Sequence, residues 1–248
     1  MTFTFGIITS GGKDSNVNTI IDSIENQRVP QSNYEIFVIG NSHVQRQNTK
    51  VIWRPEQNYL PSNKKLIWLS RKRNIVAEES TKKYVVFVND YFVFLPNWYS
   101  GWTTFLRETP DFQIGVNYVY SMEGPRHSDW VLCPYDVWEL FPGFKNQWDV
   151  QLDPSITDLS RFQYISGNYW VATKEFSLLH PQNEEIGWGN GSPEDVLWCK
   201  TIRNKVQFKM NTHSAVKSIQ PNRWKPGPFP EEGIRVLQRW NQWLNENL

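Results

Sequence analysis

The sequence predicts an α/β fold with a mixed, mostly parallel central sheet that is flanked by helices, in a single domain. Short apolar and β-branched runs alternate with a segment of helical periodicity in the N-terminal part of the chain. The order strand, helix, strand implies a right-handed crossover between parallel strands. A chain of 248 residues that is 39% hydrophobic can also bury one substantial core.

The first three elements have the clearest patterns. Residues 3–9 form a short apolar run that ends in Ser10-Gly11-Gly12, which indicates a buried strand followed by a loop. Tyr34 to Ile39 is expected to be a second buried strand. Between them a helix is predicted, because apolar residues recur three and four positions apart on one face: Val17, Ile20, Ile21 and Ile24.

The rest of the chain gives weaker signals, apart from the strongly apolar run Tyr84 to Val88. This run is expected to deliver Asn89 and Asp90 at the carboxyl end of a strand, where ligands bind in open α/β sheets. Residues 124–160 show no sustained periodicity and are expected to form long loops. Further strands are expected at Gln113 to Tyr120, Trp130 to Cys133 and Gln163 to Thr173. Helices are expected from about Ile67 to Glu79, from Pro193 to Asn204 with Ser192 as N-cap, and at the end, where Val236, Leu237, Trp240, Trp243 and Leu244 form an apolar face.

Composition excludes several classes of protein. The chain has 26 basic and 25 acidic residues, and a net charge of +1 gives no overall positive potential for binding nucleic acid. Cys133 and Cys199 are too few for a disulfide framework and are expected to be buried free thiols. No stretch approaches the roughly 18 apolar residues of a membrane span, and no leader-like N-terminus is evident, so a cytoplasmic chain without a transmembrane segment is expected.

The segment Ser10-Gly11-Gly12-Lys13-Asp14-Ser15 lies between the first predicted strand and the first predicted helix. It resembles the phosphate loop of the ATP pyrophosphatase family, in which small residues let backbone N–H groups approach a pyrophosphate. An enzyme of that type is therefore one alternative. The simpler interpretation is a turn whose glycines adopt positive φ.

A series of blocks along residues 3–213 resembles the family 2 glycosyltransferases in residues and in order. Each block alone is a weak signal, and their joint order is a strong one. The blocks are Asp22 to Gln27, Tyr34 to Ser42, Ser70 to Ala77, Tyr84 to Asp90 with Leu95-Pro96-Asn97-Trp98, Ile165-Ser166-Gly167-Asn168, and Gly187 to Asp195.

This resemblance implies a GT-A-type fold and transfer of a sugar from a nucleotide-diphosphate donor, with a UDP-sugar favoured, to a carbohydrate or glycoconjugate acceptor. Within one domain, about 1–100 would bind the nucleotide sugar, about 101–215 the acceptor, and 216–248 would form an extension with a docked helix. The implied donor-binding residues are Thr9, Ser10, Gly11, Asn41, Arg73, Asn74, Asn89 and Asp90. The implied acceptor-binding residues are Gly167, Trp188 and Glu194.

The adjacent acids Glu194 and Asp195 are the predicted catalytic residues. An acceptor hydroxyl is a poor nucleophile, so a carboxylate must take its proton as the anomeric carbon is attacked in a single, inverting displacement. Asp195 is the expected base and Glu194 would orient acceptor hydroxyls, although sequence alone allows the two roles to be exchanged. Acids in a first helical turn can also serve only to complement the helix dipole. Trp188 lies in a glycine-rich loop that could close over the donor.

The charge of the leaving diphosphate needs a divalent cation, Mn²⁺ or Mg²⁺, or basic side chains. Asp90 and His213 are the predicted metal ligands. Counted back from Pro96, however, the resemblance places the family's metal-binding acid at Tyr91, unless a one-residue insertion has shifted Asp90 into that role, and this puts metal dependence in question. A non-catalytic carbohydrate-binding protein on the same fold is therefore the second alternative. The basic residues that could neutralise the diphosphate are Lys64, Lys65, Arg71, Lys72 and Arg73.

Overall fold

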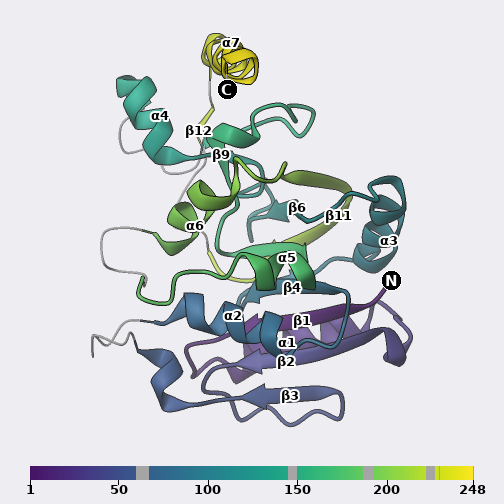
Figure 1. Cartoon of the computed structure of the whole chain (residues 1–248). Coiled ribbons are helices and arrows are strands. Elements are labelled where there is room, and N and C mark those ends of the chain that lie inside the picture. Colours follow the sequence, from purple (N-terminus) through teal and green to yellow (C-terminus); the bar gives the residue numbers. More distant parts are fainter. Residues whose placement is uncertain (60–66, 145–149, 187–192, 222–226, 229, 248) are drawn as a thin grey trace.

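The computed structural model describes residues 1–59, 67–144, 150–186, 193–221, 227–228 and 230–247. An eight-stranded sheet runs through the molecule (Figure 1). Its strands, in spatial order, are β3 (Thr49–Ile52), β2 (Tyr34–Ile39), β1 (Phe3–Ile8), β4 (Tyr84–Asn89), β10 (Tyr169–Thr173), β6 (Ile114–Tyr120), β11 (Lys209–Ser218) and β5 (Phe92–Phe94). The first four are parallel, β6 and β11 are parallel, and β10 and β5 run antiparallel to their neighbours. The predicted mixed, mostly parallel sheet is confirmed.

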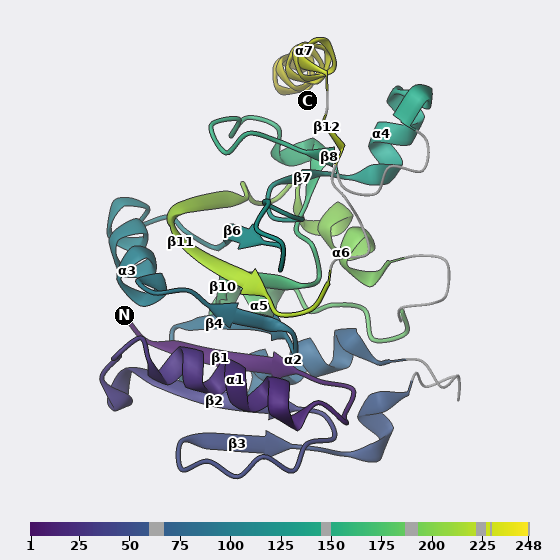
Figure 2. The same cartoon turned by 180° about the vertical axis from the view of Figure 1, so that it is seen from behind.

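Helices cover both faces of this sheet, as the two opposite views show (Figures 1 and 2). On one face, α1 (Asp14–Glu25) and α3 (Trp98–Glu108) contribute to one apolar cluster. On the other, α2 (Leu69–Glu79), α5 (Lys174–Leu179) and α6 (Glu194–Ile202) contribute to a second cluster. The predicted apolar face of α1, Val17, Ile20, Ile21 and Ile24, is completely buried. Burial of each of these side chains contributes about 1.5–3 kcal/mol of hydrophobic stabilisation.

A smaller sheet lies beyond the main one and corrects two predictions. It contains β12 (Gly227–Pro228), β8 (Val150–Gln151), β7 (Val131–Leu132) and β9 (Gln163–Tyr164). The expected strand from Gln163 to Thr173 is therefore two strands in two sheets, because residues 165–168 turn between them. Within residues 124–160, β7 confirms the strand expected at Trp130 to Cys133, whereas α4 (Pro134–Leu140) and β8 occur where long loops were expected.

Several elements have no counterpart in the prediction. The short strands β3 and β5 and the helix α5 are too short to show a clear apolar period, and β11 is polar with a register shift between Asn211 and Ala215. Helix α3 does carry a buried apolar face of Trp98, Trp102, Phe105 and Leu106 at helical spacing, which the prediction missed. Helix α6 begins one residue later than expected, with Pro193 rather than Ser192 at the N-cap. Short 3-10 turns occur at Gln31–Asn33, Pro55–Asn58, Pro142–Phe144 and Ser160–Phe162.

The terminal helix α7 (Glu231–Asn247) docks as predicted, through part of its expected face. Leu237 is buried, and Leu244 packs against the same core. Trp240 and Trp243, however, are 51% and 59% exposed, so they lie outside the docked stripe. No helix in the described part of the chain is long and apolar enough to cross a membrane. Cys133 and Cys199 are buried free thiols, as expected.

Candidate active site

Two neighbouring parallel strands bring the predicted donor-side residues together. Strands β1 and β4 pair in register with Ile8 opposite Asn89, and the amide of Asp90 donates to the Ile8 carbonyl at 3.1 Å. Thr9 and Asp90 therefore leave the sheet side by side at its carboxyl edge, where ligands bind in such sheets. The apolar run Tyr84 to Val88 predicted Asp90 at this edge, whereas the pairing of β1 with β4 was not predicted.

Asp90 is buried and both of its carboxylate oxygens already have partners. Thr9 Oγ1 donates to Asp90 Oδ2 at 2.7 Å, and the Lys13 ammonium lies 2.9 Å from Asp90 Oδ1. The Lys13 side chain keeps 35% of its surface exposed, whereas that of Asp90 keeps 5%. Lys13 also lies over the ring of Tyr91, 5.6 Å from its centroid.

The loop that carries Lys13 is stabilised by its glycine turn and by hydrogen bonds from Lys72. Gly11 and Gly12 have φ values of 103° and 71°, a region that favours glycine, so the expected glycine turn is confirmed. Lys72 is fully buried and donates to the Thr9 carbonyl at 2.7 Å and to Asn58 Oδ1 at 2.8 Å. Burial lowers the pKa of Lys72 to about 8, against the opposing effect of the Asp90 charge. Lys72 is thus a buried support of the loop.

On the opposite side, a buried hydrogen-bonded network organises the start of α6. Arg73 donates to Glu194 Oε1 at 2.8 Å and to the Gly167 carbonyl at 2.7 Å. The Gly167 amide in turn donates to Asp195 Oδ2 at 2.6 Å. A side chain at Gly167 would meet Arg73 Nη2 at 2.6 Å and Asp195 Oδ2 at 3.0 Å, so only glycine fits between them. Arg73 therefore positions the two acids.

The two acids differ in their electrostatic surroundings. Glu194 is buried and ion-paired with Arg73, while its second oxygen, Oε2, has no hydrogen-bond partner among the residues that the structure describes. Within the same described ranges, Asp195 has no direct ion pair. Its removal from water and the neighbouring Glu194 charge raise its pKa to about 7, although Arg73 and the amides of Gly167 and Val196 act in the opposite direction. A carboxyl group of this kind can exchange protons near neutral pH.

A cavity of about 620 Å³ joins these two sides. The predicted residues that line it are Thr9, Ser10, Arg73, Asn89, Asp90, Gly167, Glu194 and Asp195. Residues that were not predicted also line it, among them Lys13, Tyr91, His127, Ser128, Asn168 and Ser218. Lys13 was visible in the sequence, within the Ser10 to Ser15 motif. His127 and Ser128 come from a stretch without periodicity, where no signal pointed to them.

Other predicted residues lie away from the cavity. The amide of Asn74 is occupied by the segment that follows α5, since it donates to the Gln182 carbonyl and to Glu184 Oε1, both at 2.9 Å. Gly11 and Asn41 do not line the cavity, and a side chain added at Gly11 would come within 3.0 Å of Asn41. Arg71 pairs with Glu78 and Glu184 on the surface. Trp188, Lys64 and Lys65 lie outside the described residues.

The described residues do not assemble a cation site around Asp90. Its two oxygens accept from Thr9 and Lys13, and the Tyr91 hydroxyl donates to Asn168 Oδ1 at 2.6 Å. His213 is not brought to Asp90: it lies on β11 beside α3, with Nε2 3.5 Å from Glu108 Oε2. Within the described ranges, no group of three or more His, Cys, Asp and Glu side chains could hold a metal ion. Mg²⁺ and Mn²⁺ need several oxygen ligands, so this set does not fit them.

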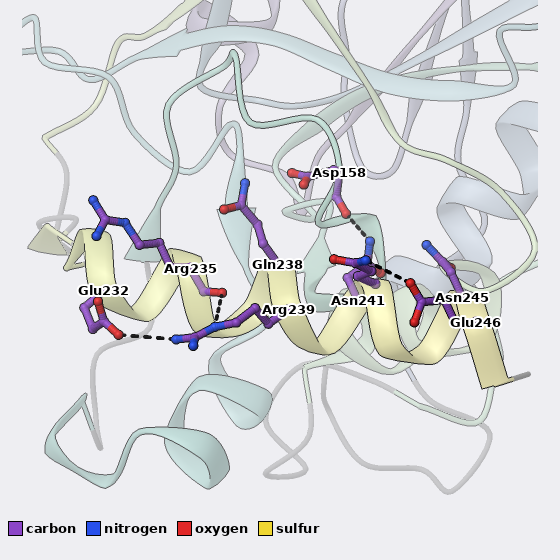
Figure 3. Close-up of a pocket in the computed structure, with 9 residues that line it drawn as sticks. Asp158, Glu232, Arg235, Gln238, Arg239, Asn241, Asn245 and Glu246 are labelled. Carbon is purple, nitrogen blue, oxygen red and sulfur yellow. Dashed lines mark hydrogen bonds and ion pairs between the residues drawn. The ribbon is translucent and has the colours of Figure 1, made fainter.

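A larger hollow, about 760 Å³, lies along α7 (Figure 3). Its walls are polar side chains that pair with one another: Asn241 donates to the Asp158 carbonyl at 2.6 Å, and Arg239 lies 3.4 Å from Glu232. It contains neither a buried acid nor a cation held for a ligand among the residues shown. The cavity beside Asp195 is therefore the candidate active site.

Comparisons with known proteins support the fold. The chain resembles the crystal structure of S. aureus TarS (TM-score 0.58, 13% identity, 100% of this chain and 40% of that one). It also resembles GalNAc-T7 with UDP, GalNAc and Mn²⁺ (TM-score 0.60, 15% identity, 98% and 49%), and TarS 1–349 in complex with UDP-GlcNAc (TM-score 0.57, 13% identity, 97% and 65%). The chain thus spans about 40–65% of the length of these proteins. No family model and no curated protein matches the sequence. The fold is of the GT-A type.

Proposed function

We propose that this chain is a glycosyltransferase that moves a sugar from a UDP-sugar to an acceptor hydroxyl with inversion, using Asp195 as the base. The observation that carries the proposal is the pairing, across one cavity, of a cationic donor side with a carboxyl group whose pKa is raised to about 7. A GT-A-type sheet supports it, because its carboxyl edge supplies the donor side.

The reaction uses these groups in a single step. The acceptor oxygen forms a bond to the anomeric carbon while the bond from that carbon to the diphosphate oxygen breaks. The acceptor proton moves to Asp195, and the bonding electron pair leaves with the nucleoside diphosphate. A base with a pKa near the working pH is the most effective for such a transfer. No step is written through a metal ion, since the residues around Asp90 that the structure describes do not form a cation site.

The contacts favour one assignment of the two acids, which sequence left open. Glu194 Oε1 is held in a buried ion pair 2.8 Å from the Arg73 guanidinium, so this carboxylate is already engaged and Glu194 is the poorer candidate for the proton transfer. Its unpartnered Oε2 is buried and suits acceptance of a hydrogen bond from an acceptor hydroxyl. Asp195, without a direct cationic partner, is the better base.

The donor class is proposed from the structural neighbours, because the structures of two of them hold UDP or UDP-GlcNAc. The ATP pyrophosphatase alternative is less well supported, because Lys13 in its supposed phosphate loop is paired with Asp90 in a GT-A-type sheet. The non-catalytic alternative predicts binding without turnover.

A panel of nucleotide sugars and ATP tests the proposal. A ligand that binds only the native state raises the melting temperature, so UDP-sugars should stabilise the protein and ATP should not. Release of UDP from the stabilising donor, in the presence of an acceptor panel, then separates an enzyme from a binding protein. Asp111→Asn is the matched control for the variant Asp195→Asn, because Asp111 is an exposed acid that lies before β6. Stabilisation by ATP with release of pyrophosphate would contradict the proposal.

A further inference from the structure

We infer that the Lys13 ammonium supplies the positive charge that binds the donor's diphosphate, in the place where the sequence predicted a divalent cation. The inference deepens the proposed function and rests on it. It concerns the donor side of the cavity, where the residue after Asp90 is Tyr91 rather than an acid.

The position of Lys13 supports this role. It is the N-cap residue of α1, at the end of the glycine loop that follows β1, and its ammonium lies 2.9 Å from Asp90 Oδ1. Thr9 holds the other Asp90 oxygen at 2.7 Å, so the carboxylate is fixed and in turn orients the ammonium. Asp90 thereby acts as a positioning residue for Lys13.

The other cations near the cavity are already engaged. Arg73 is 2% exposed and is used by Glu194, Gln182 and the Gly167 carbonyl. Lys72 is fully buried and donates to Thr9 and Asn58. Lys13 differs, because its side chain is 35% exposed at the cavity and an ammonium has three donors. Among the cavity-lining residues that the structure describes, Lys13 is the cation with capacity for a phosphate.

The charges in the cavity require such a group. A nucleoside diphosphate brings negative charge to a wall that already contains Asp90, with Glu194 and Asp195 opposite. Charge-assisted hydrogen bonds from a Lys ammonium to phosphate oxygens offset that repulsion and favour departure of the leaving group. Each oxygen of the Asp90 carboxylate accepts a hydrogen bond, one from Thr9 and one from Lys13, so the ammonium already neutralises its negative charge.

The test is UDP binding by calorimetry, in EDTA and in Mn²⁺, for wild type, Lys13→Met and Lys13→Arg. We expect wild type to bind UDP equally well in both buffers, and Lys13→Met to bind UDP about 10- to 100-fold more weakly, without rescue by Mn²⁺. Lys13→Arg should retain most of the affinity. Uridine, which lacks phosphate, should bind to Lys13→Met as tightly as to wild type. If Lys13 had only a structural role, Lys13→Met would bind both UDP and uridine more weakly. Lys50→Met is the matched control, since Lys50 pairs with Glu79 on the surface.

Each other outcome overturns the inference. Loss of wild-type UDP binding in EDTA with recovery in Mn²⁺ would assign the charge to a metal ion. Wild-type affinity for UDP in Lys13→Met would remove Lys13 from the donor site. Failure of wild type to bind UDP in either buffer would overturn the proposed function itself, and with it the role of Lys13.

Discussion

The two sides of the cavity are built in different ways. On the donor side, Thr9, Lys13 and Asp90 come from loops that follow two adjacent parallel strands, and their charges are paired at 2.9 Å. On the acceptor side, Arg73, Gly167 and Asp195 come from distant segments that are joined by hydrogen bonds from side chains to one another and to the Gly167 backbone. The donor side is arranged to hold charge in place, while the acceptor side leaves one carboxyl group able to take a proton.

The largest expected effect follows from replacing that carboxyl group. Asp195→Asn should lower kcat by about 10²- to 10⁴-fold, the usual contribution of a general base, because the amide cannot accept the acceptor proton. UDP affinity should not change, since the donor side is intact. Steady-state kinetics together with calorimetry measure both quantities, with Asp111→Asn as control. Equal losses of kcat and UDP affinity would contradict the assignment of Asp195 to the proton transfer and not to donor binding.

The buried ion pair of the acceptor side gives the next effect. Arg73→Met should lower the free energy of unfolding by about 3–5 kcal/mol, because Glu194 would remain buried without its partner. The cation–π contact of Arg73 with Trp170, 4.9 Å from ring centroid to guanidinium carbon, would also be lost. Denaturant unfolding measures the change, and Arg71→Met is the control on the same helix. An unchanged midpoint would show that the network is not built on Arg73.

The pH dependence of stability distinguishes Asp195 from an ordinary surface acid. Its pKa is raised from 3.8 to about 7 in the folded protein, so folding favours the protonated form. Its contribution to stability is fully present below pH 3.8 and is lost as pH rises through 7. Wild type should therefore lose a few kcal/mol relative to Asp195→Asn between about pH 4 and 8. A difference in unfolding free energy that stays constant over this range would contradict the raised pKa.

The same titration sets the pH dependence of turnover. Because the base must be deprotonated, kcat/KM should rise with pH up to an apparent pKa near 7. The residual activity of Asp195→Asn should not show this rise. A profile that is flat from about pH 5 to 8 in wild type would remove Asp195 from the proton transfer.

The smallest effect is expected at the surface. Lys50 and Glu79 lie 2.7 Å apart with side chains 55% and 42% exposed, so Lys50→Met should change the free energy of unfolding by at most about 1 kcal/mol. The contrast with Arg73→Met measures how much burial adds to an ion pair of similar length. Comparable losses in the two variants would contradict that contrast.

The same difference explains what the sequence could predict. Apolar runs located β1 and β4, and the strand order then placed Asn89 and Asp90 at the ligand-binding edge. The network of Arg73 with Gly167 and Glu194 could not be derived in this way, because it depends on side chains about a hundred residues apart meeting in three dimensions. Arg73, predicted to bind the donor, lines the cavity and also donates to Glu194 and to the Gly167 carbonyl, contacts that the sequence did not indicate.

Polar strands and short elements escaped prediction for a related reason. Strand β11 carries a register shift and few apolar residues, so no period of two identified it, and His213 on it could not be placed. Lys13 was noticed only as part of a glycine loop. Its pairing with Asp90 follows from the register of β1 with β4, which no local pattern contains.

A crystal structure of the protein with UDP-GlcNAc, the donor seen with one structural neighbour, tests the central claim most directly. The claim is that Lys13 and Asp195 act from opposite sides on one bound donor. It predicts the diphosphate within hydrogen-bond distance of the Lys13 ammonium and the anomeric carbon facing Asp195 across the cavity. A donor bound elsewhere, or one whose diphosphate avoids Lys13 while its sugar faces away from Asp195, would contradict it.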